Sequence, residues 1–160
     1  MQRPVALDRI GPQGTSLDVE ASATELPAIA TRLHVVALQG LRCAFKLRRV
    51  GATTIEAQGV LQAQVTETCV VSLDPFEHEV QESFTLYFVP AGTEDDDLDP
   101  EAIDEVPYSG SAIDLGEAAV EQLALALDPY PRRPGAALPA DITVEPSGPF
   151  AALQALRPRD

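Results

Sequence analysis

Apolar and polar residues alternate along three long stretches in the middle of the chain, at residues 35–47, 55–65 and 80–88. A period of two places one row of side chains in a core and the other row in water, which is typical of a half-buried strand. The connections between these stretches are short, and one of them contains the turn-forming sequence Leu-Asp-Pro at 73–75. We therefore predict a meander of long antiparallel strands.

Two other segments have the spacing of a helix. In residues 25–33, apolar residues recur three and four positions apart, and Thr24 occupies the position of an N-cap. A second helix is predicted over 114–127, where Asp114 and Glu117 form a capping box. The fold class that follows is α+β: a mainly antiparallel, twisted sheet in a meander, open or barrel-like, with two short helices and an irregular C-terminal arm. The side chains predicted to form the core are Val35, Leu41, Phe45, Ile55, Leu61, Val65, Phe84, Leu86, Phe88, Leu123 and Leu127.

Acidic residues are concentrated in one short segment, and many of the prolines lie near the C-terminus. Residues 94–105 contain eight acids in twelve positions, and like charges at this density repel one another. We therefore expect residues 1–128 to form a single α+β domain that carries an acidic mobile loop at 92–108. Residues 129–160 are expected to form a Pro-rich arm that ends in a short amphipathic segment.

The chain carries a large excess of negative charge. Its 160 residues include 25 Asp and Glu against 11 Lys and Arg, a formal net charge of −14 at pH 7. A field of this sign repels phosphate backbones and attracts basic proteins, of which ribosomal proteins are one class. The excess acid also has a simpler interpretation, which is solubility. No signal peptide and no run as long as a membrane span is evident, so we expect a cytoplasmic protein without a membrane partner.

Residues that bind metals or act in catalysis are few. A structural zinc site requires about four Cys or His ligands, and the candidates are Cys43, Cys69, His34 and His78. Since Cys43 lies in the middle of a predicted strand and His78 follows Cys69 by nine residues, we predict neither a metal nor another cofactor. The alternation of its strand is expected to leave His78, the candidate general base, on the wet face. With no glycine-rich phosphate loop either, we predict no enzymatic activity and no small-molecule substrate.

The segment CVVSLDPFEHEVQESFTLYFVP, at residues 69–90, has the features of a known family. A long strand ends at Cys69 in a CxxC-like turn, and the pair Pro75-Phe76 leads into another long strand. The other marks, in chain order, are Gly59-Val60-Leu61, Ile113-Asp114-Leu115, the Leu- and Pro-containing segment 125–131 and Pro149-Phe150-Ala151-Ala152-Leu153. Over residues 55–156, the chain thus resembles the YceD family of large ribosomal RNA subunit accumulation proteins.

The chain departs from the family pattern at the turn. Ser72 stands where the second cysteine of the CxxC-like turn is expected, and residues 132–135 supply no cysteine after the Pro-containing segment. The family turn of this chain therefore consists of Cys69, Ser72, Pro75 and Phe76, without the ligands of a zinc site. A degenerate zinc-binding module is kept as an alternative.

The resemblance implies a role in ribosome biogenesis, in which the protein supports the accumulation of large-subunit ribosomal RNA. Together with the negative charge, it leads us to expect a non-catalytic protein that binds a basic ribosomal protein or a large-subunit assembly intermediate. The side chains expected to dock this partner lie in the acidic loop, the arm and the tail, and are Asp95, Asp96, Asp97, Tyr130, Pro131, Phe150 and Leu153. An equal alternative for the apolar tail is that it packs on the sheet of its own domain.

Direct contact with ribosomal RNA is the alternative function. Arg42, Lys46 and Arg48 occupy even positions of the first long strand, so the alternation places them on one face. These cations either contact RNA or offset carboxylates on neighbouring strands, and the second interpretation is favoured.

Overall fold

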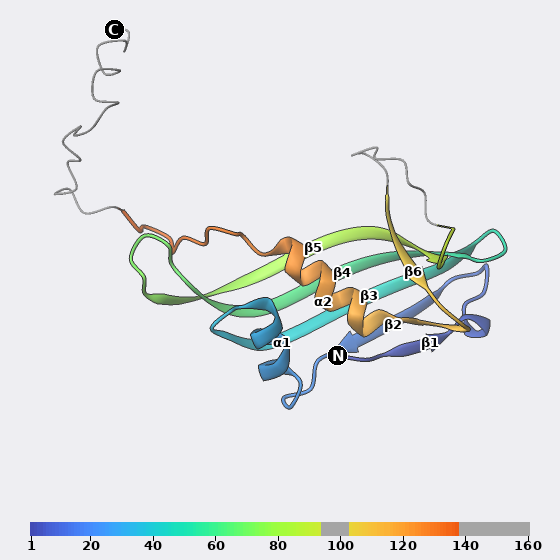
Figure 1. Ribbon diagram of the computed structural model, residues 1–160, viewed down its shortest axis with the longest axis horizontal. Coiled ribbons are helices and arrows are strands. Elements are labelled where there is room, and N and C mark those ends of the chain that lie inside the picture. Colours follow the sequence, from blue (N-terminus) through green and yellow to red (C-terminus); the bar gives the residue numbers. More distant parts are fainter. Residues whose placement is uncertain (94–102, 138–160) are drawn as a thin grey trace, which may run out of the picture.

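A five-stranded sheet forms the centre of the molecule (Figure 1). The computed structural model describes residues 1–93 and 103–137. Along the sheet, the strands follow the order β2 (Thr15–Glu20), β3 (Ala37–Val50), β4 (Thr54–Thr68), β5 (Pro75–Pro90) and β6 (Asp104–Tyr108). The first four pair antiparallel with their neighbours, which confirms the predicted meander, whereas β6 joins β5 in parallel. Because the two edges, β2 and β6, do not pair with each other, the sheet is open and the barrel-like alternative is wrong.

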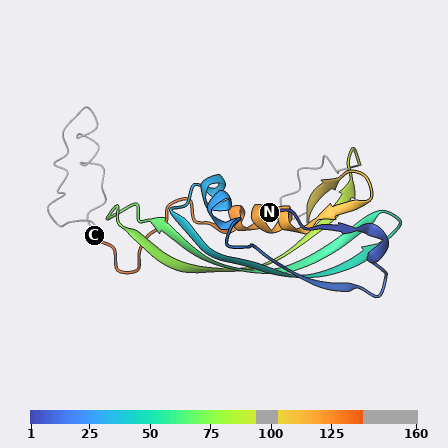
Figure 2. The same cartoon turned by 90° about the horizontal axis from the view of Figure 1, so that it is seen from below.

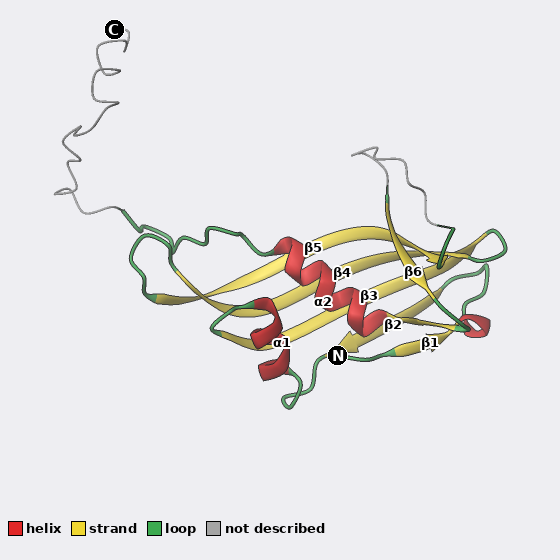
Figure 3. Cartoon of the chain, viewed as in Figure 1, coloured by secondary structure: helices red, strands yellow, loops and turns green. Residues whose placement is uncertain are grey.

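Both helices lie on the same face of this sheet (Figure 2). The helix α1 (Leu26–Leu33) packs on β3, and α2 (Leu115–Ala126) packs on β2, β4 and β5. The remaining elements of the described residues are a small antiparallel sheet of β1 (Pro4–Ala6) and β7 (Ala112–Asp114) and the 3-10 turn η1 (Leu7–Arg9). The α+β fold class is thus confirmed (Figure 3), and the opposite face of the five-stranded sheet carries no helix within residues 1–93 and 103–137.

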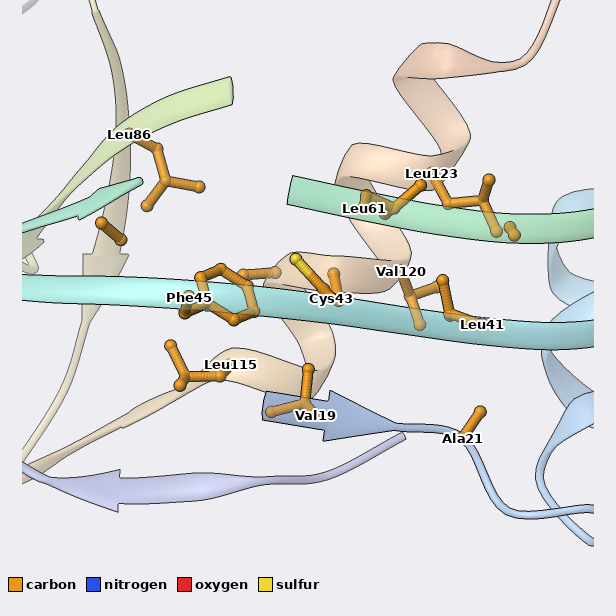
Figure 4. Close-up of a cluster of buried hydrophobic side chains, with 14 of the residues drawn as sticks. Val19, Ala21, Leu41, Cys43, Phe45, Leu61, Leu86, Leu115, Val120 and Leu123 are labelled. Atoms are coloured by element: carbon orange, nitrogen blue, oxygen red, sulfur yellow. The ribbon is translucent and has the colours of Figure 1, made fainter. Parts of the chain in front are cut away.

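The hydrophobic core fills the space between the sheet and α2. After the bulge at residues 38–40, odd-numbered positions of β3 and of β4 point toward the helices, and Leu41, Phe45 and Leu61 belong to one buried cluster with residues of α2 that include Leu115, Val120 and Leu123 (Figure 4). The predicted core residues that are fully buried are Leu41, Phe45, Ile55, Leu61, Val65, Leu86, Phe88 and Leu123. Those that are half-buried against the same cluster are Val35, Phe84 and Leu127.

A side-chain cap marks the start of α2, whereas the N-cap residue of α1 makes no capping hydrogen bond. The Asp114 Oδ1 accepts hydrogen bonds from the backbone N–H groups of Gly116 and Glu117, at 2.9 and 3.1 Å, which confirms the predicted N-cap of α2. At α1 the prediction of Thr24 as the cap is wrong, since Glu25 occupies the N-cap position. The Glu25 carboxylate instead accepts hydrogen bonds from the Ser22 N–H and hydroxyl, at 2.9 and 2.8 Å.

The segment expected as an acidic mobile loop, 92–108, contains the strand β6 at its C-terminal end. Only the start of β6 is acidic, while Val106 and Tyr108 pack against the core. The Tyr108 hydroxyl also donates a hydrogen bond of 2.7 Å to the Thr53 carbonyl. Backbone pairing with β5 and this packing therefore outweigh the repulsion between carboxylates, and the expectation of a loop is wrong for 104–108. Residues 94–102 lie outside the described residues.

Candidate functional site

The family turn joins β4 to β5, and hydrogen bonds between its own backbone groups close it. The Cys69 N–H donates to the Asp74 carbonyl at 2.9 Å, and the Leu73 N–H donates to the Cys69 carbonyl at 2.9 Å. Leu73 adopts the left-handed conformation, with φ at 62°. The Asp74 N–H lies 3.4 Å from the Ser72 hydroxyl. Ser72 therefore takes part in the turn through its hydroxyl and its backbone.

The start of the arm lies against this turn. The Val70 N–H donates a hydrogen bond of 2.9 Å to the Pro131 carbonyl. The Arg133 N–H donates to the Cys69 Sγ at 3.4 Å, and the Arg133 guanidinium lies 3.9 Å from the Asp74 carboxylate. Two family motifs that are far apart in sequence, the turn and the Pro-containing segment, are thus in direct contact.

Cys69 is the centre of these contacts and has no exposed surface. The pKa of the Cys69 thiol is lowered from 9.0 to about 6, chiefly by a hydrogen bond from the Ser72 backbone N–H and next by one from the Arg133 backbone N–H. Burial acts in the opposite direction and raises this pKa. By contrast, burial in the core raises the pKa of the Cys43 thiol to about 12. Because the Cys69 sulfur is covered, it serves the turn and the arm as a hydrogen-bond acceptor rather than as an accessible nucleophile.

His78 lies on the core side of β5, so the prediction of a wet face is wrong. It pairs with the buried Val65 across β4, and its ring stacks on Phe76 with the ring centroids 5.3 Å apart. Its Nε2 lies 2.6 Å from the Glu67 carboxylate, a side chain that is only 8% exposed. Within the described residues no hydroxyl or thiol is hydrogen-bonded to His78, so the pair is not joined to a side-chain nucleophile of the kind used in covalent catalysis.

The three basic residues proposed for RNA contact do lie on the open face of the sheet, and two of them are in ion pairs. Arg42 lies 2.7 Å from the Asp18 carboxylate, and Arg48 lies 2.7 Å from the Glu56 carboxylate. Lys46 has no ion pair with any residue in 1–93 or 103–137, and it borders a hollow of about 410 Å³ on this face. The cations of this face are therefore largely offset by carboxylates of the neighbouring strands.

The predicted partner-binding residues are only partly within the described residues. The Tyr130 side chain is 69% exposed, and its backbone N–H donates to the Asp128 carboxylate at 2.8 Å. Pro131 is half-buried where the arm meets the turn. The remaining candidates fall on residues that the structure does not describe, namely Asp95, Asp96, Asp97, Phe150 and Leu153.

Two general features bear on the class of protein. In the described parts of the chain, no group of three or more His, Cys, Asp or Glu side chains is arranged to hold a metal ion. No helix there is long and apolar enough to cross a bilayer.

Sequence reasoning missed two contacts near the family turn. The Glu67–His78 pair could have been predicted in part, because the alternation of β5 puts His78 on the same face as the apolar residues Val80 and Phe84. The contact between Cys69 and Arg133 has no local signal, since it joins residues that are 64 positions apart.

Comparison with known proteins places the chain in a family. The model of the family described as large ribosomal RNA subunit accumulation protein YceD matches residues 57–157. No curated protein and no solved structure gives a match. The matched region contains the turn, most of β4, all of β5, α2 and the start of the arm. This chain therefore belongs to the YceD family of large ribosomal RNA subunit accumulation proteins.

Proposed function

We propose that the protein is a non-catalytic, cytoplasmic factor that supports the accumulation of large-subunit ribosomal RNA by binding a basic ribosomal protein or a large-subunit assembly intermediate. The observation that carries the proposal is the family match over residues 57–157, because its description names this process. The charge and the surface of the chain support the kind of partner.

Negative charge supports a basic partner. The formal net charge of −14 attracts cationic proteins and accelerates their association, while it repels nucleic acid. Glu77, Glu79 and Glu82 are exposed on β5, and none of them forms an ion pair within the described residues. A cationic partner would therefore meet carboxylates that no cation within residues 1–93 and 103–137 already pairs.

The arm supports a docking role of a different kind. Contacts to the family turn hold its first residues, and Tyr130 projects into solvent beside them. An exposed tyrosine on a held backbone offers a large contact area at a small cost in conformational entropy.

Direct RNA binding is the second candidate, and it rests on Lys46. This is the cation of the open face that has no ion pair in the described part of the chain, and it lies beside a largely apolar hollow whose polar lining residues include Ser16, Gln58 and Thr85. One such cation is a small positive surface for the binding of a phosphate backbone.

The proposed function is tested by affinity purification of the tagged protein at low and moderate salt, with mass spectrometry of the bound proteins and sequencing of bound RNA. We expect basic large-subunit proteins, recovered less well at moderate salt because the Debye length shortens. The triple variant Asp95→Asn, Asp96→Asn, Asp97→Asn should recover less of them. The matched control Asp8→Asn, Glu20→Gln, Glu121→Gln removes the same charge elsewhere and should recover nearly as much as the unaltered protein.

Three results would contradict the proposal. Recovery of no basic ribosomal protein at either salt concentration would remove it. Recovery of ribosomal RNA without protein, lost when Arg42, Lys46 and Arg48 are neutralised, would favour direct RNA contact. Stoichiometric zinc in the purified protein, by elemental analysis, would favour the degenerate zinc module.

A further inference from the structure

The strand β5 (Pro75–Pro90) is paired along nearly its whole length on one side and along only its last five residues on the other. Its register with β4 runs from Pro75 to Phe88, whereas β6 pairs only with residues 86–90. Within residues 1–93 and 103–137, no strand lies beside residues 76–85 on the side away from β4. Figure 1 shows β5 as the outermost strand there, with β6 crossing only near its end. This stretch, called here the acidic edge, presents backbone N–H and C=O groups that no strand of the described residues pairs.

The acidic edge is long for an unpaired strand. At about 3.4 Å per residue, residues 76–85 extend over roughly 34 Å, which is more than the length of an average strand. Proteins usually shorten, cover or charge such an edge, because it is a template for pairing with another chain. Here the protection comes from charge.

Glutamates supply that charge on both sides of the strand. Glu77 and Glu79 share the open face of the sheet, and Glu82 points to the helical face, with all three exposed. His78, the histidine of this stretch, is already engaged by Glu67. Two copies of the acidic edge would bring carboxylates against carboxylates, so pairing between copies is disfavoured. A strand that carries lysine or arginine would meet the opposite charge at the same positions.

We propose that the acidic edge is the docking site of the basic partner, which adds an extended, lysine- or arginine-bearing segment to β5 as a further strand of the sheet. The inference rests on the proposed function, since it names where and how that partner binds. Backbone hydrogen bonds supply affinity for any extended chain. Glu77, Glu79 and Glu82 select a cationic one and exclude both nucleic acid and a second copy of this protein.

The first test uses a synthetic ten-residue peptide of alternating lysine and threonine, with binding measured by fluorescence anisotropy. We expect binding to the full-length protein, accompanied by slower amide hydrogen exchange within residues 76–85. A second peptide of the same sequence, N-methylated at every other residue, keeps the charge but loses one row of backbone donors. It should bind at least about tenfold more weakly.

The second test reverses the charge of the edge. The variant Glu77→Lys, Glu79→Lys, Glu82→Lys should no longer bind the lysine peptide. It should instead bind a ten-residue peptide of alternating glutamate and threonine. The control Asp8→Lys, Glu20→Lys, Glu121→Lys makes the same change in net charge at exposed positions on other elements. Near-ultraviolet circular dichroism checks that both variants keep the native packing.

Three outcomes would overturn the acidic edge as the docking site. They are no binding of the lysine peptide, equal losses in the two triple variants, and amide protection confined to residues outside 76–85. The same variants, used in the affinity purification, separate this inference from the proposed function. If the edge variant recovers as much basic large-subunit protein as the unaltered protein does, the acidic edge is not the docking site and the proposed function stands. If the unaltered protein recovers none, the function itself is wrong.

Discussion

The backbone N–H of Arg133 donates a hydrogen bond to the Sγ of Cys69, at 3.4 Å, and so joins the arm to the family turn across 64 residues of sequence. Together with the bond from the Val70 N–H to the Pro131 carbonyl, it holds the arm against the end of the long β4–β5 hairpin. The order of turn, helix and Pro-containing segment in the sequence thus has a structural consequence, because the helix α2 returns the chain to the turn.

Stability should depend on pH through Cys69. Its pKa in the folded protein is about 6, lowered from 9.0, so the folded state favours the thiolate. This contribution is fully present above pH 9 and is lost as the pH falls through 6. The free energy of unfolding of the unaltered protein, relative to Cys69→Ala, should therefore rise between pH 6 and pH 9, as measured by urea denaturation.

Cys43 provides the control for that experiment. Its pKa is raised from 9.0 to about 12 by burial, so the loss of stability in Cys43→Ala should stay nearly constant from pH 6 to about pH 8 and should not grow toward pH 9. Thiolate absorbance in the Cys43→Ala variant should titrate with a midpoint near the pKa of about 6. A midpoint at or above 9.0, the ordinary value, would show that the turn does not stabilise a thiolate.

Gly59 should not tolerate a side chain. It lies between Phe45 and Phe84 in the register of three adjacent strands, and a Cβ at this position would stand 2.2 Å from the Phe84 ring. The ring is held edge-to-face on Phe45, with the centroids 5.8 Å apart, so it cannot move without loss of packing. We expect Gly59→Ala to lower the free energy of unfolding by about 1–3 kcal/mol in urea denaturation.

Two further variants show whether the clash with Phe84 is the cause. Gly40 is also in a strand, with open space where a Cβ would stand, so Gly40→Ala should have a much smaller effect. Adding Gly59→Ala to Phe84→Ala should cost less than adding it to the unaltered protein. Strictly additive effects would contradict this explanation.

Asp114 should contribute to stability through three backbone groups. Its Oδ1 accepts hydrogen bonds from Gly116 and Glu117 at the start of α2, and from the Arg3 N–H at 2.8 Å. Asp114→Ala leaves these donors without that acceptor, so we expect a loss of about 1–2 kcal/mol in thermal or urea denaturation. Asp8→Ala, at an exposed acid of η1, is the control. An equal and small effect of both changes would show that the cap contributes little.

Tyr130 should matter for binding and not for folding. Its side chain is 69% exposed, and truncation to alanine leaves the backbone contacts of the arm in place. We expect Tyr130→Ala to change the free energy of unfolding by less than about 0.5 kcal/mol. The same variant should recover less basic large-subunit protein in the affinity purification, and undiminished recovery would remove Tyr130 from the docking surface.

The sequence predicts the long antiparallel strands well, because a period of two is sustained over many residues and each connection is short. The strand β6 is different, since it is short, begins with two acids and contains Pro107. It pairs in parallel with β5 at the sheet edge, where a proline is tolerated, and this pairing is non-local. The hydrophobic period and the strand propensity of the residues carry no information about such a non-local pairing.

The candidate site was predicted less completely than the fold. The residues of the turn were identified from the family motif, but their contact with the arm depends on the path of α2 over the sheet. The ion pairs of Arg42 and Arg48 followed from the expectation that neighbouring strands supply carboxylates, and Asp18 and Glu56 do so. The sequence does not predict the acidic edge of β5, because the length of an unpaired edge is set by the extent of the partner strand β6.

The central claim is that this protein supports the accumulation of large-subunit ribosomal RNA, and the most direct measurement is the ratio of large- to small-subunit ribosomal RNA in cells without it. Removal of the protein should lower this ratio and the free large-subunit peak in sucrose gradients, and re-expression of the unaltered chain should restore both. An unchanged ratio and an unchanged gradient after complete removal would contradict the account.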